Sequence, residues 1–469
     1  MKELFGRKNE LGLLEKRYES PHFEFGYVYG QRRIGKTALM QMFSKGKKSL
    51  LFYATESSDS INLSSFASTL SSVSGRHYGQ FENWYSFFQA IDAYFGDEKG
   101  VMVIDEYTNI VAPGDARKRK GDFQSSLQKA IDLLFVKRRF VLILTGSNVS
   151  FMEREIGNGE APLYKRNTFS LRVGKFDFDE SLLAFGKTES DWEKARLLCL
   201  TSTFPYYLSL IDDSQSLEAN LDLLFYNQDA VFVDSPGKII TSAKARGWWY
   251  SSILDAIANG YGTLNGICAF LKADSNEIYN YIKELIADGV LAKRELFMSK
   301  RSVHYEFLDP VLAFYYRFIR KRAEEIKNGF GAIIKKEQQA AIGEFIERSF
   351  EKVCISYLEC LSKKGRLNGA YTSFQNYQVD NSKLGRSIEL DIVSKSGDSL
   401  LVGEAKLSKR KRPAKDYFDM KEDTSVAPFS AFKTIDYYLF GASGFADDLL
   451  SQSDAHLHLV DLKAMFGIY

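Results

Sequence analysis

The sequence has few cysteines, little excess charge and no long apolar run. Its four cysteines occur without any CxxC pair, which favours a reducing compartment over a disulfide scaffold. Because 62 Lys and Arg stand against 60 Asp and Glu, the chain is no polycation. Any nucleic-acid surface must therefore come from a local patch. No apolar run approaches the length of a membrane span, and the first ten residues contain no apolar signal region.

Length and composition indicate an ordinary globular protein of several domains. At 469 residues the chain is too long for one core, which predicts two to four domains. Hydrophobic residues make up 45% and charged residues 26% of the chain. No repeat or low-complexity segment is visible. We expect a cytoplasmic protein without membrane contact.

The stretch YGQRRIGKTALMQMF, residues 29–43, has the pattern of a phosphate-binding loop. A strand-like segment precedes it and a helix-forming segment follows it, which is the context this loop needs. Backbone N–H groups and the helix N-terminus would hold phosphates, Lys36 would reach the β- and γ-phosphates, and the Thr37 hydroxyl would bind Mg²⁺. The predicted ATP-binding residues of the loop are Gly30, Gln31, Arg32, Arg33, Ile34, Gly35, Lys36, Thr37 and Ala38.

A second acidic motif follows in GVMVIDEY, residues 100–107, a buried-strand pattern that ends in Asp105 and Glu106. Phosphoryl transfer needs an acid that organises Mg²⁺, and Asp105 fits that role. Glu106 is the natural candidate for the group that positions or activates water. Ser147 and Asn148 end another strand and would sense the γ-phosphate or water, or would simply cap the strand end.

Strand-like and helical segments alternate over the first third of the chain. SLLFYAT at 49–55, GVMVIDEY and FVLILTGSN at 140–148 are strand-like, and helical patterns lie between them. This order predicts a mostly parallel sheet with helices on both faces and a ligand at the carboxyl ends of the strands.

Taken together, FGRKNEL, GQRRIGKT, VMVIDE, LILTGSN and APLYKR resemble the archaeal-type ATPases of the STAND group in the AAA+ superfamily. The resemblance covers roughly the first half of the chain. It implies adenine contacts from Phe5, Gly6 and Arg7. It also implies that Arg166 is the transition-state arginine, in cis or in trans, whereas a surface ion pair is the alternative. Family members often have Gly where Lys165 stands.

The middle of the chain has the pattern of a helical lid and a winged helix. Residues 175–240 are predicted as the lid, and residues 241–325 as three helices followed by two strands. The third helix carries four acids, at 274, 277, 284 and 288, against Lys283 alone, which disfavours phosphate contacts. The wing carries Lys293, Arg294, Lys300 and Arg301, so DNA contact and protein contact both stay open, with protein contact favoured.

The last third contains a helix with acids on one face and a hairpin with a carboxylate–lysine pattern. Glu344, Glu347 and Glu351 share a helical face. The segment 387–409 predicts a β-hairpin that carries Asp391 on one strand, and Glu404 and Lys406 on one face of the other. Carboxylates beside a lysine would hold Mg²⁺ and activate water against a phosphodiester.

This hairpin resembles the PD-(D/E)XK nuclease fold and the C-terminal domain that often follows this type of ATPase. The resemblance implies catalytic roles for Asp391, Glu404 and Lys406, with Glu347 as a further metal ligand. A surface hairpin or an inactive nuclease-like module is the alternative. The basic run at 406–415 would contact DNA, and RKRK at 117–120 would meet DNA or a partner subunit. His456 and His458 are expected to be two outward residues of a strand.

The combined prediction is an α/β protein with four parts: an ATPase core at 1–174, a helical lid at 175–240, a winged helix at 241–325 and a nuclease-like domain at 330–469. This protein would bind and hydrolyse ATP with Mg²⁺ and cleave DNA under nucleotide control. Formation of an oligomer is left open. The competing prediction is a nucleotide-dependent regulatory switch, or a DNA-binding regulator, with an inactive C-terminal domain.

Overall fold

The computed structural model describes residues 5–111, 122–188, 190–233, 247–298, 303–381, 385–426 and 428–467. The chain divides into two compact units. One, the N-terminal unit, runs to Lys175 and includes Ala287–Gly289. The other, the C-terminal unit, holds the rest from Phe176 on.

The N-terminal unit is built on a five-stranded sheet with the order β2-β3-β4-β1-β5. All neighbouring strands are parallel. The strands are β1 (Glu24–Tyr29), β2 (Ser49–Tyr53), β3 (Gly100–Asp105), β4 (Phe140–Gly146) and β5 (Phe169–Arg172). Every residue of β1, β3 and β4 is buried, as expected for parallel strands covered on both faces.

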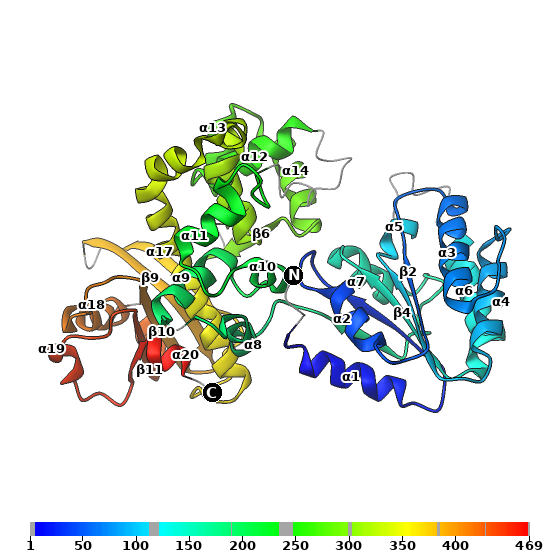
Figure 1. Ribbon diagram of the computed structural model, residues 1–469. Coiled ribbons are helices and arrows are strands. Elements are labelled where there is room, and N and C mark those ends of the chain that lie inside the picture. Colours follow the sequence, from blue (N-terminus) through cyan, green and yellow to red (C-terminus); the bar gives the residue numbers. More distant parts are fainter. Residues whose placement is uncertain are drawn as a thin grey trace. The chain divides into compact units, whose positions relative to one another are not determined.

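Helices cover both faces of this sheet. Figure 1 shows α3, α4 and α6 together on one side, with α1 and α2 on the other. The helices are α1 (Lys8–Tyr18), α2 (Lys36–Ser44), α3 (Asp59–Ser74), α4 (Trp84–Phe95), α5 (Thr108–Val111), α6 (Asp122–Leu133), η1 (Phe135–Lys137) and α7 (Val149–Gly157). The α3/α4/α6 side holds an aromatic core in which Phe66 stacks on Phe52 and Trp84 meets Phe123 edge to face. Burial of each such side chain contributes about 1.5–3 kcal/mol.

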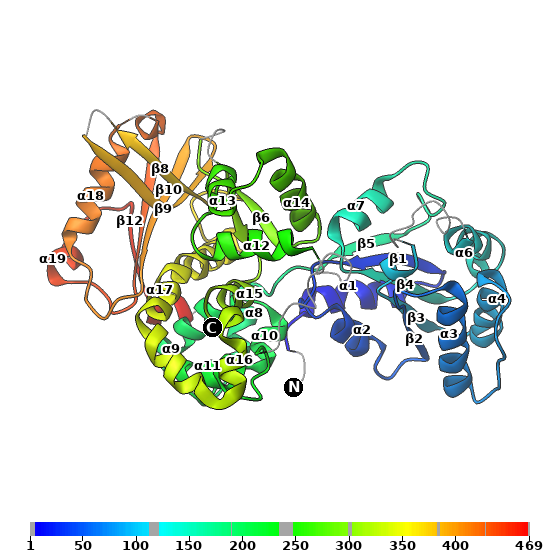
Figure 2. The same cartoon turned by 90° about the horizontal axis from the view of Figure 1, so that it is seen from above.

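The C-terminal unit begins with short helices that pack against a long one. These are α8 (Phe178–Leu182), η2 (Leu183–Phe185), α9 (Asp191–Thr201), α10 (Pro205–Leu210), α11 (Leu217–Leu221) and η3 (Asp222–Tyr226). α9 lies beside α17 (Gly331–Lys363), a helix of 33 residues (Figure 2). Residues predicted as a lid therefore pack with the start of the C-terminal domain.

Three helices and two strands follow, here called the three-helix segment. They are α12 (Trp248–Ala258), α13 (Leu264–Leu271), α14 (Ser275–Ala287), β6 (Leu291–Glu295) and β7 (Val303–Phe307). β6 and β7 are antiparallel, and we call them the β6–β7 hairpin. Short helical pieces lead from it into α17: α15 (Pro310–Phe314), η5 (Tyr315–Ile319), η6 (Arg320–Arg322), α16 (Ala323–Glu325) and η7 (Ile326–Phe330).

A second five-stranded sheet completes the C-terminal unit, in the order β12-β11-β10-β9-β8. Its strands are β8 (Gln375–Asn381), β9 (Arg386–Ser396), β10 (Ser399–Lys406), β11 (Thr434–Gly441) and β12 (Leu457–Asp461). β8, β9 and β10 are antiparallel neighbours, whereas β10, β11 and β12 are parallel. The accompanying helices are α18 (Ala414–Thr424), η8 (Phe429–Ala431), α19 (Asp447–Leu450) and α20 (Leu462–Phe466).

One irregularity in this sheet lies beside the predicted hairpin acid. Gln375 of β8 pairs with Val393 of β9, but Tyr377 pairs with Leu390. Asn376 therefore faces two residues of β9, Asp391 and Ile392, which is the arrangement of a β-bulge. Bulges re-aim side chains, and this one lies at Asp391 and Ile392 of β9, directly before the alternation of buried and exposed residues breaks.

The predicted fold class is confirmed in its main features: an α/β protein with a parallel five-stranded sheet and a separate C-terminal sheet domain. Within the described residues, no helix is both long and apolar enough to cross a membrane.

Candidate functional site

The predicted phosphate-binding loop lies between β1 and α2. Gly35 precedes α2 with φ +82°, and Arg33 also has a left-handed φ of 69°. Gly30 is required by close packing, because a Cβ there would lie 2.1 Å from the carbonyl oxygen of Val173. The loop thus turns tightly and leads into the N-terminus of a nine-residue helix, whose first N–H groups suit an anion.

Lys36 is buried, and its ammonium is held by polar groups of the loop and by Ser147, which directly follows β4. Its Nζ donates to the carbonyl oxygens of Gly30 at 2.9 Å and Gln31 at 3.0 Å, and to Ser147 Oγ at 2.8 Å. Burial lowers the pKa of Lys36, while the nearby acids Glu106 and Asp105 oppose that shift. A cation held in a water-poor loop is suited to phosphate oxygens.

The two residues predicted to bind Mg²⁺, Thr37 and Asp105, meet at the start of α2. The Thr37 hydroxyl donates to Asp105 Oδ2 at 2.6 Å, which joins α2 to the end of β3. The other carboxylate oxygen of Asp105 accepts from the Thr145 hydroxyl of β4. The carboxylate is therefore oriented from both sides, as Mg²⁺ coordination requires.

Glu106 directly follows β3 in an uncommon backbone conformation, with φ +52°. Its backbone N–H donates to Thr145 Oγ1 at 3.0 Å, and its carboxylate accepts from the Ser147 hydroxyl and, at 3.3 Å, the Ser147 N–H. A strained residue held by several bonds is typical of functional sites. Ser147 thus contacts both Lys36 and Glu106, whereas Asn148 caps α7 through the Phe151 N–H at 2.9 Å.

The FGR segment reaches the loop through Arg7. The buried Arg7 guanidinium donates to the carbonyl oxygens of Ile34 and Gly174, each at 2.7 Å, and to Glu10 Oε1 at 2.7 Å. Gly6 and Arg7 both have left-handed φ angles. Arg7 therefore braces the phosphate-binding loop, while adenine contacts of Phe5, Gly6 and Arg7 stay a prediction.

Arg166 is not brought to the other ATP-site residues of its own sheet. Arg166 lies shortly before the first residue of β5, whereas the loop follows the last residue of β1, the parallel neighbour of β5. The two therefore lie at opposite ends of these strands. Its guanidinium donates two hydrogen bonds of 2.9 Å to the Asp132 carboxylate, so the side chain forms an ion pair with Asp132. A transition-state role in trans stays a prediction. Lys165 adopts φ +58°, the conformation that Gly takes easily, so the loop keeps its turn without glycine.

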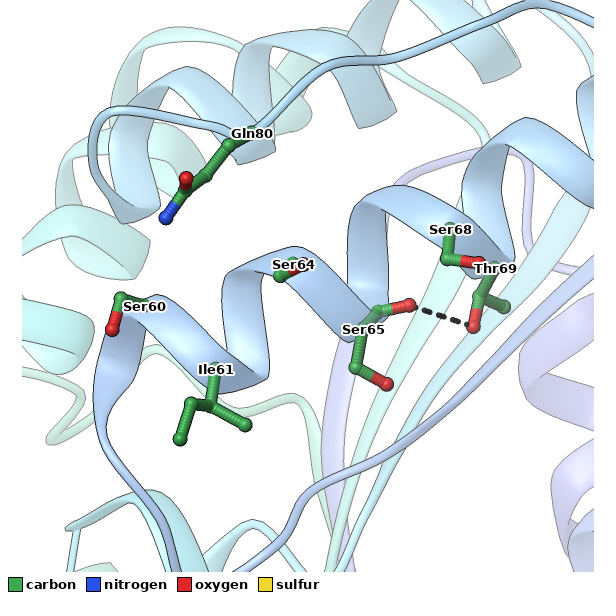
Figure 3. Close-up of a pocket in the computed structure, with 7 residues that line it drawn as sticks. All are labelled: Ser60, Ile61, Ser64, Ser65, Ser68, Thr69 and Gln80. Carbon is green, nitrogen blue, oxygen red and sulfur yellow. Dashed lines mark hydrogen bonds between the residues drawn. The ribbon is translucent and has the colours of Figure 1, made fainter.

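The residues present fit ATP and Mg²⁺. Gly30, Gly35 and the helix N-terminus accommodate phosphates, and Thr37 with Asp105 supplies two oxygen donors. By contrast, a surface hollow of about 600 Å³ lies on α3 with no ionisable side chain in its lining (Figure 3). Its lining residues are Ser60, Ile61, Ser64, Ser65, Ser68, Thr69 and Gln80. It offers no group for phosphoryl transfer.

A second candidate site lies in the C-terminal sheet, where Asp391 and Glu404 come from the neighbouring strands β9 and β10. Asp391 Oδ2 accepts from the Ala405 N–H at 3.0 Å, which fixes the carboxylate at the bulge. Burial raises the pKa of Asp391, and the Ala405 bond and the cations Arg412 and Lys406 oppose the shift. Burial, and then the charge of Asp391, raise the pKa of Glu404 to about 8. Two acids forced together in this way favour a cation between them.

Two cations of the basic run at 406–415, Lys406 and Arg412, lie near this pair. The Lys406 ammonium pairs with Asp416 at 3.2 Å, and Arg412 pairs with the same carboxylate oxygen at 2.7 Å. Arg412 is buried and also donates to the Glu404 carbonyl oxygen at 2.8 Å. One of the six cations is therefore structural, and the other five are exposed. Sequence reasoning counted Arg412 only as part of the run.

The acid on α17 whose pKa is affected by Asp391 is Glu351, whereas the metal-ligand role of Glu347 stays a prediction. Glu347 is exposed, whereas Glu351 is partly buried. Burial raises the pKa of Glu351 to about 7, with Asp391 as a further cause and Arg294 and Asn376 opposing it. Glu351 lies about one helical turn beyond Glu347. The sequence therefore predicted the acidic face of the helix, but it did not predict which acid of that face would lie near Asp391. Within the described residues, no group of three or more His, Cys, Asp or Glu is arranged to hold a metal as it stands.

The cations of the β6–β7 hairpin pair inside the C-terminal unit. Lys293 pairs with Glu295 at 2.6 Å, and Arg294 lies 3.8 Å from both Glu306 and Glu351. Lys300 and Arg301, and the RKRK run at 117–120, lie outside the described residues.

His456 and His458 meet a common carboxylate rather than facing outward alone. His456 Nδ1 lies 3.0 Å and His458 Nε2 3.4 Å from Oδ1 of the buried Asp436. His458 lies on β12 and His456 directly precedes that strand, and their partner Asp436 on β11 was not visible in the sequence.

Comparisons with known proteins support the first site. Residues 4–195 match the family described as an ATPase domain predominantly from Archaea. Residues 315–417 match a family described as archaeal and bacterial proteins of unknown function. An uncharacterised protein of Methanocaldococcus jannaschii is 26% identical over 77% of this chain and 78% of its own length.

Solved structures were also compared with the chain, and the first of the two described here has a similar fold. A Walker-type ATPase of Pyrococcus abyssi matches with a TM-score of 0.50 at 19% identity, over 67% of this chain and 96% of that one. The Aeropyrum pernix ORC2 protein matches with a TM-score of 0.47 at 13% identity, over 71% of this chain and 96% of that one. The N-terminal part of the chain is a P-loop ATPase domain.

Proposed function

We propose that this chain is an ATP-hydrolysing protein of the STAND/AAA+ type whose C-terminal domain cleaves DNA with a divalent metal under nucleotide control. The observation that carries the nuclease part is the partly buried Asp391–Glu404 pair on neighbouring strands beside Lys406. In the sequence the pair follows the long helix α17, which carries Glu351, and it lies next to exposed cations.

At the ATP site, the chain's own residues bind and orient. Lys36 and the loop N–H groups hold the β- and γ-phosphates, and Thr37 and Asp105 hold Mg²⁺. Glu106 orients the attacking water, and Ser147 links that carboxylate to Lys36. Bound Mg²⁺ neutralises charge that develops on the phosphoryl oxygens.

At the C-terminal site, Asp391 and Glu404 would hold a divalent ion, with Glu351 as the acid of the neighbouring helix. Bound there, the ion would polarise a phosphodiester and lower the pKa of a water. Lys406, half exposed and tethered by Asp416, is placed to donate to a phosphate oxygen. The exposed cations of 406–415 would follow the DNA backbone.

The three-helix segment has the element order of a winged helix but suits an internal role. Asp274, Glu277 and Glu284 are exposed on or beside α14, and the hairpin cations have acidic partners. Both features disfavour phosphate contacts. This segment would transmit the nucleotide state rather than read DNA.

A nucleotide-dependent regulatory switch with an inactive C-terminal domain is the second candidate. It is favoured by the lack, within the described ranges, of a ready group of three metal-ligating side chains. It predicts that Asp391→Asn changes no activity.

The test is cleavage of supercoiled plasmid and single-stranded DNA with Mg²⁺ or Mn²⁺. Wild type, Asp391→Asn and Glu404→Gln are compared with Asp398→Asn as the matched control. Asp398 lies in the same hairpin but is exposed and pairs only with exposed Lys433 among the described contacts. Cleavage by wild type and Asp398→Asn, lost in the other two, supports the nuclease. Absence of cleavage in every protein, with ATP hydrolysis intact, overturns it in favour of the switch.

A further inference from the structure

The Glu351 carboxylate is held by a side chain that the sequence did not single out. Asn376 Nδ2 donates to Glu351 Oε1 at 2.6 Å. A hydrogen bond to an ionised carboxylate is roughly twice as strong as a neutral one, and it fixes direction as well. Asn376 therefore determines where the acid of α17 points.

Asn376 owes its place to the bulge. It is the β8 residue opposite Asp391 and Ile392, where the register between β8 and β9 shifts. A regular ladder would pair it with one residue and keep the strict alternation of faces. The bulge instead brings an amide of β8 and the Asp391 carboxylate of β9 to the same part of the sheet, where Glu351 of α17 approaches.

The backbone of Asn376 is anchored by the three-helix segment. Its carbonyl oxygen accepts from the Phe297 N–H at 2.8 Å, just beyond β6. Phe297 is buried in the core of the C-terminal sheet and stacks on Phe429 with ring centroids 6.3 Å apart. From the same hairpin, the Arg294 guanidinium lies 3.8 Å from Glu351.

We propose that Asn376 is a positioning residue of the Asp391–Glu404 site, which directs Glu351 toward Asp391 and is itself fixed by the β6–β7 hairpin. The inference rests on the proposed metal site. It makes that site a joint product of the sheet, α17 and the three-helix segment. A hairpin displacement would loosen Asn376 and move Arg294 away from Glu351 together.

The experiment measures Mn²⁺ binding to the full chain by titration calorimetry, without DNA or nucleotide. Asn376→Ala should weaken binding about tenfold or more, as loss of an outer-shell partner of a metal ligand does. The control is Gln378→Ala, which removes an exposed amide two residues along the same strand. It should bind Mn²⁺ like wild type.

A double variant separates positioning from general damage. If Asn376 acts through Glu351, adding Asn376→Ala to Glu351→Gln should weaken binding no further. Thermal unfolding of each variant checks that the fold is kept.

The outcomes are distinct. Binding by Asn376→Ala that equals Gln378→Ala overturns the inference and leaves the metal site standing. A tenfold loss that persists in the Glu351→Gln background also overturns it, because the effect then does not pass through Glu351. Failure of wild type itself to bind Mn²⁺ overturns the proposed metal site.

Discussion

The two candidate sites of this chain are built in different ways. In the ATP site, the loop, Asp105, Glu106 and Ser147 all lie at or directly after the carboxyl ends of neighbouring parallel strands. In the C-terminal site, the groups come from α17, β8, β9, β10, the β6–β7 hairpin and the loop before α18. The first site is fixed largely by backbone, and the second depends on side chains from distant segments.

This difference decides which perturbations should matter most. A phosphate-binding loop built from backbone groups should tolerate substitution of a nearby side chain. It should lose activity when the lysine or an acid that acts on the phosphates is removed. A site assembled from distant side chains is sensitive to charge balance and to positioning residues. Substitutions in the two sites should therefore differ in how strongly they act.

The largest effect is expected for Lys36→Ala. Removing the buried ammonium that faces the phosphates should lower ATP hydrolysis by about 10³-fold, in the range seen when a preorganised charge is lost. Phosphate release under steady-state conditions measures it. Lys45→Ala, an exposed lysine at the end of α2, is the matched control. Hydrolysis by Lys36→Ala at the wild-type rate would mean that the loop is no ATP site.

Glu106→Gln should separate binding from chemistry in the same site. Loss of the base should slow hydrolysis about 10²-fold, at the lower end for such groups. ATP binding should remain, because the phosphate contacts come from the loop. Fluorescent-nucleotide binding and phosphate release are measured side by side. Equal losses of ATP binding and of ATP hydrolysis would show that Glu106 supports the fold and not the reaction.

Sequence reasoning worked well where a site is contiguous. Gly30 to Thr37 form one uninterrupted motif, and Asp105 and Glu106 end a strand of unmistakable pattern. Parallel topology then places these ends together without any long-range information. Even in this site the sequence did not predict the partner of Arg166, because no sequence pattern indicates that its guanidinium pairs with Asp132.

The C-terminal site was only partly predictable. The alternation of residues along the strands predicted that Asp391, Glu404 and Lys406 belong to the site. The helix carries several acids on one face, and only the packing of the folded chain shows that Glu351 lies near Asp391. The bulge has no glycine or other signal in β9, so the place of Asn376 was hidden. Arg412 looked like its five exposed neighbours because burial depends on how the chain continues into α18.

Charge balance in the C-terminal site predicts a pH effect on stability. The pKa of Glu404 is about 8 in the fold, against an ordinary 4.5. The folded state therefore binds more protons between these values, and its stability falls as pH rises from about 4.5 to about 8. Glu404→Gln removes this loss. It should raise Tm by about 2–4 °C at pH 9, for a gain of about 1 kcal/mol, and should change it little at pH 5.

Thermal melts in metal-free buffer with a chelator measure this effect. Asp398→Asn again serves as the exposed control and should follow wild type at both pH values. A Glu404→Gln difference that is the same at pH 5 and pH 9 would contradict the burial of an acid beside Asp391.

The smallest effect is expected for Arg166→Ala in dilute, monomeric protein. The lost ion pair with Asp132 is partly exposed and contributes less than about 1 kcal/mol. Asp132→Asn should cause the same small drop in stability, and hydrolysis should change less than twofold in either variant. A tenfold drop in the dilute monomer would contradict the placement of Arg166. A drop that appears only on self-association would assign it the role in trans.

Nucleotide control of cleavage links the two sites. We would measure plasmid cleavage with Mn²⁺ in the presence of ATP, ADP or no nucleotide, by wild type and by Lys36→Ala. ATP should change the wild-type cleavage rate several-fold and leave the rate of Lys36→Ala unchanged. Wild-type cleavage that proceeds at one rate under all three conditions would contradict nucleotide control of cleavage.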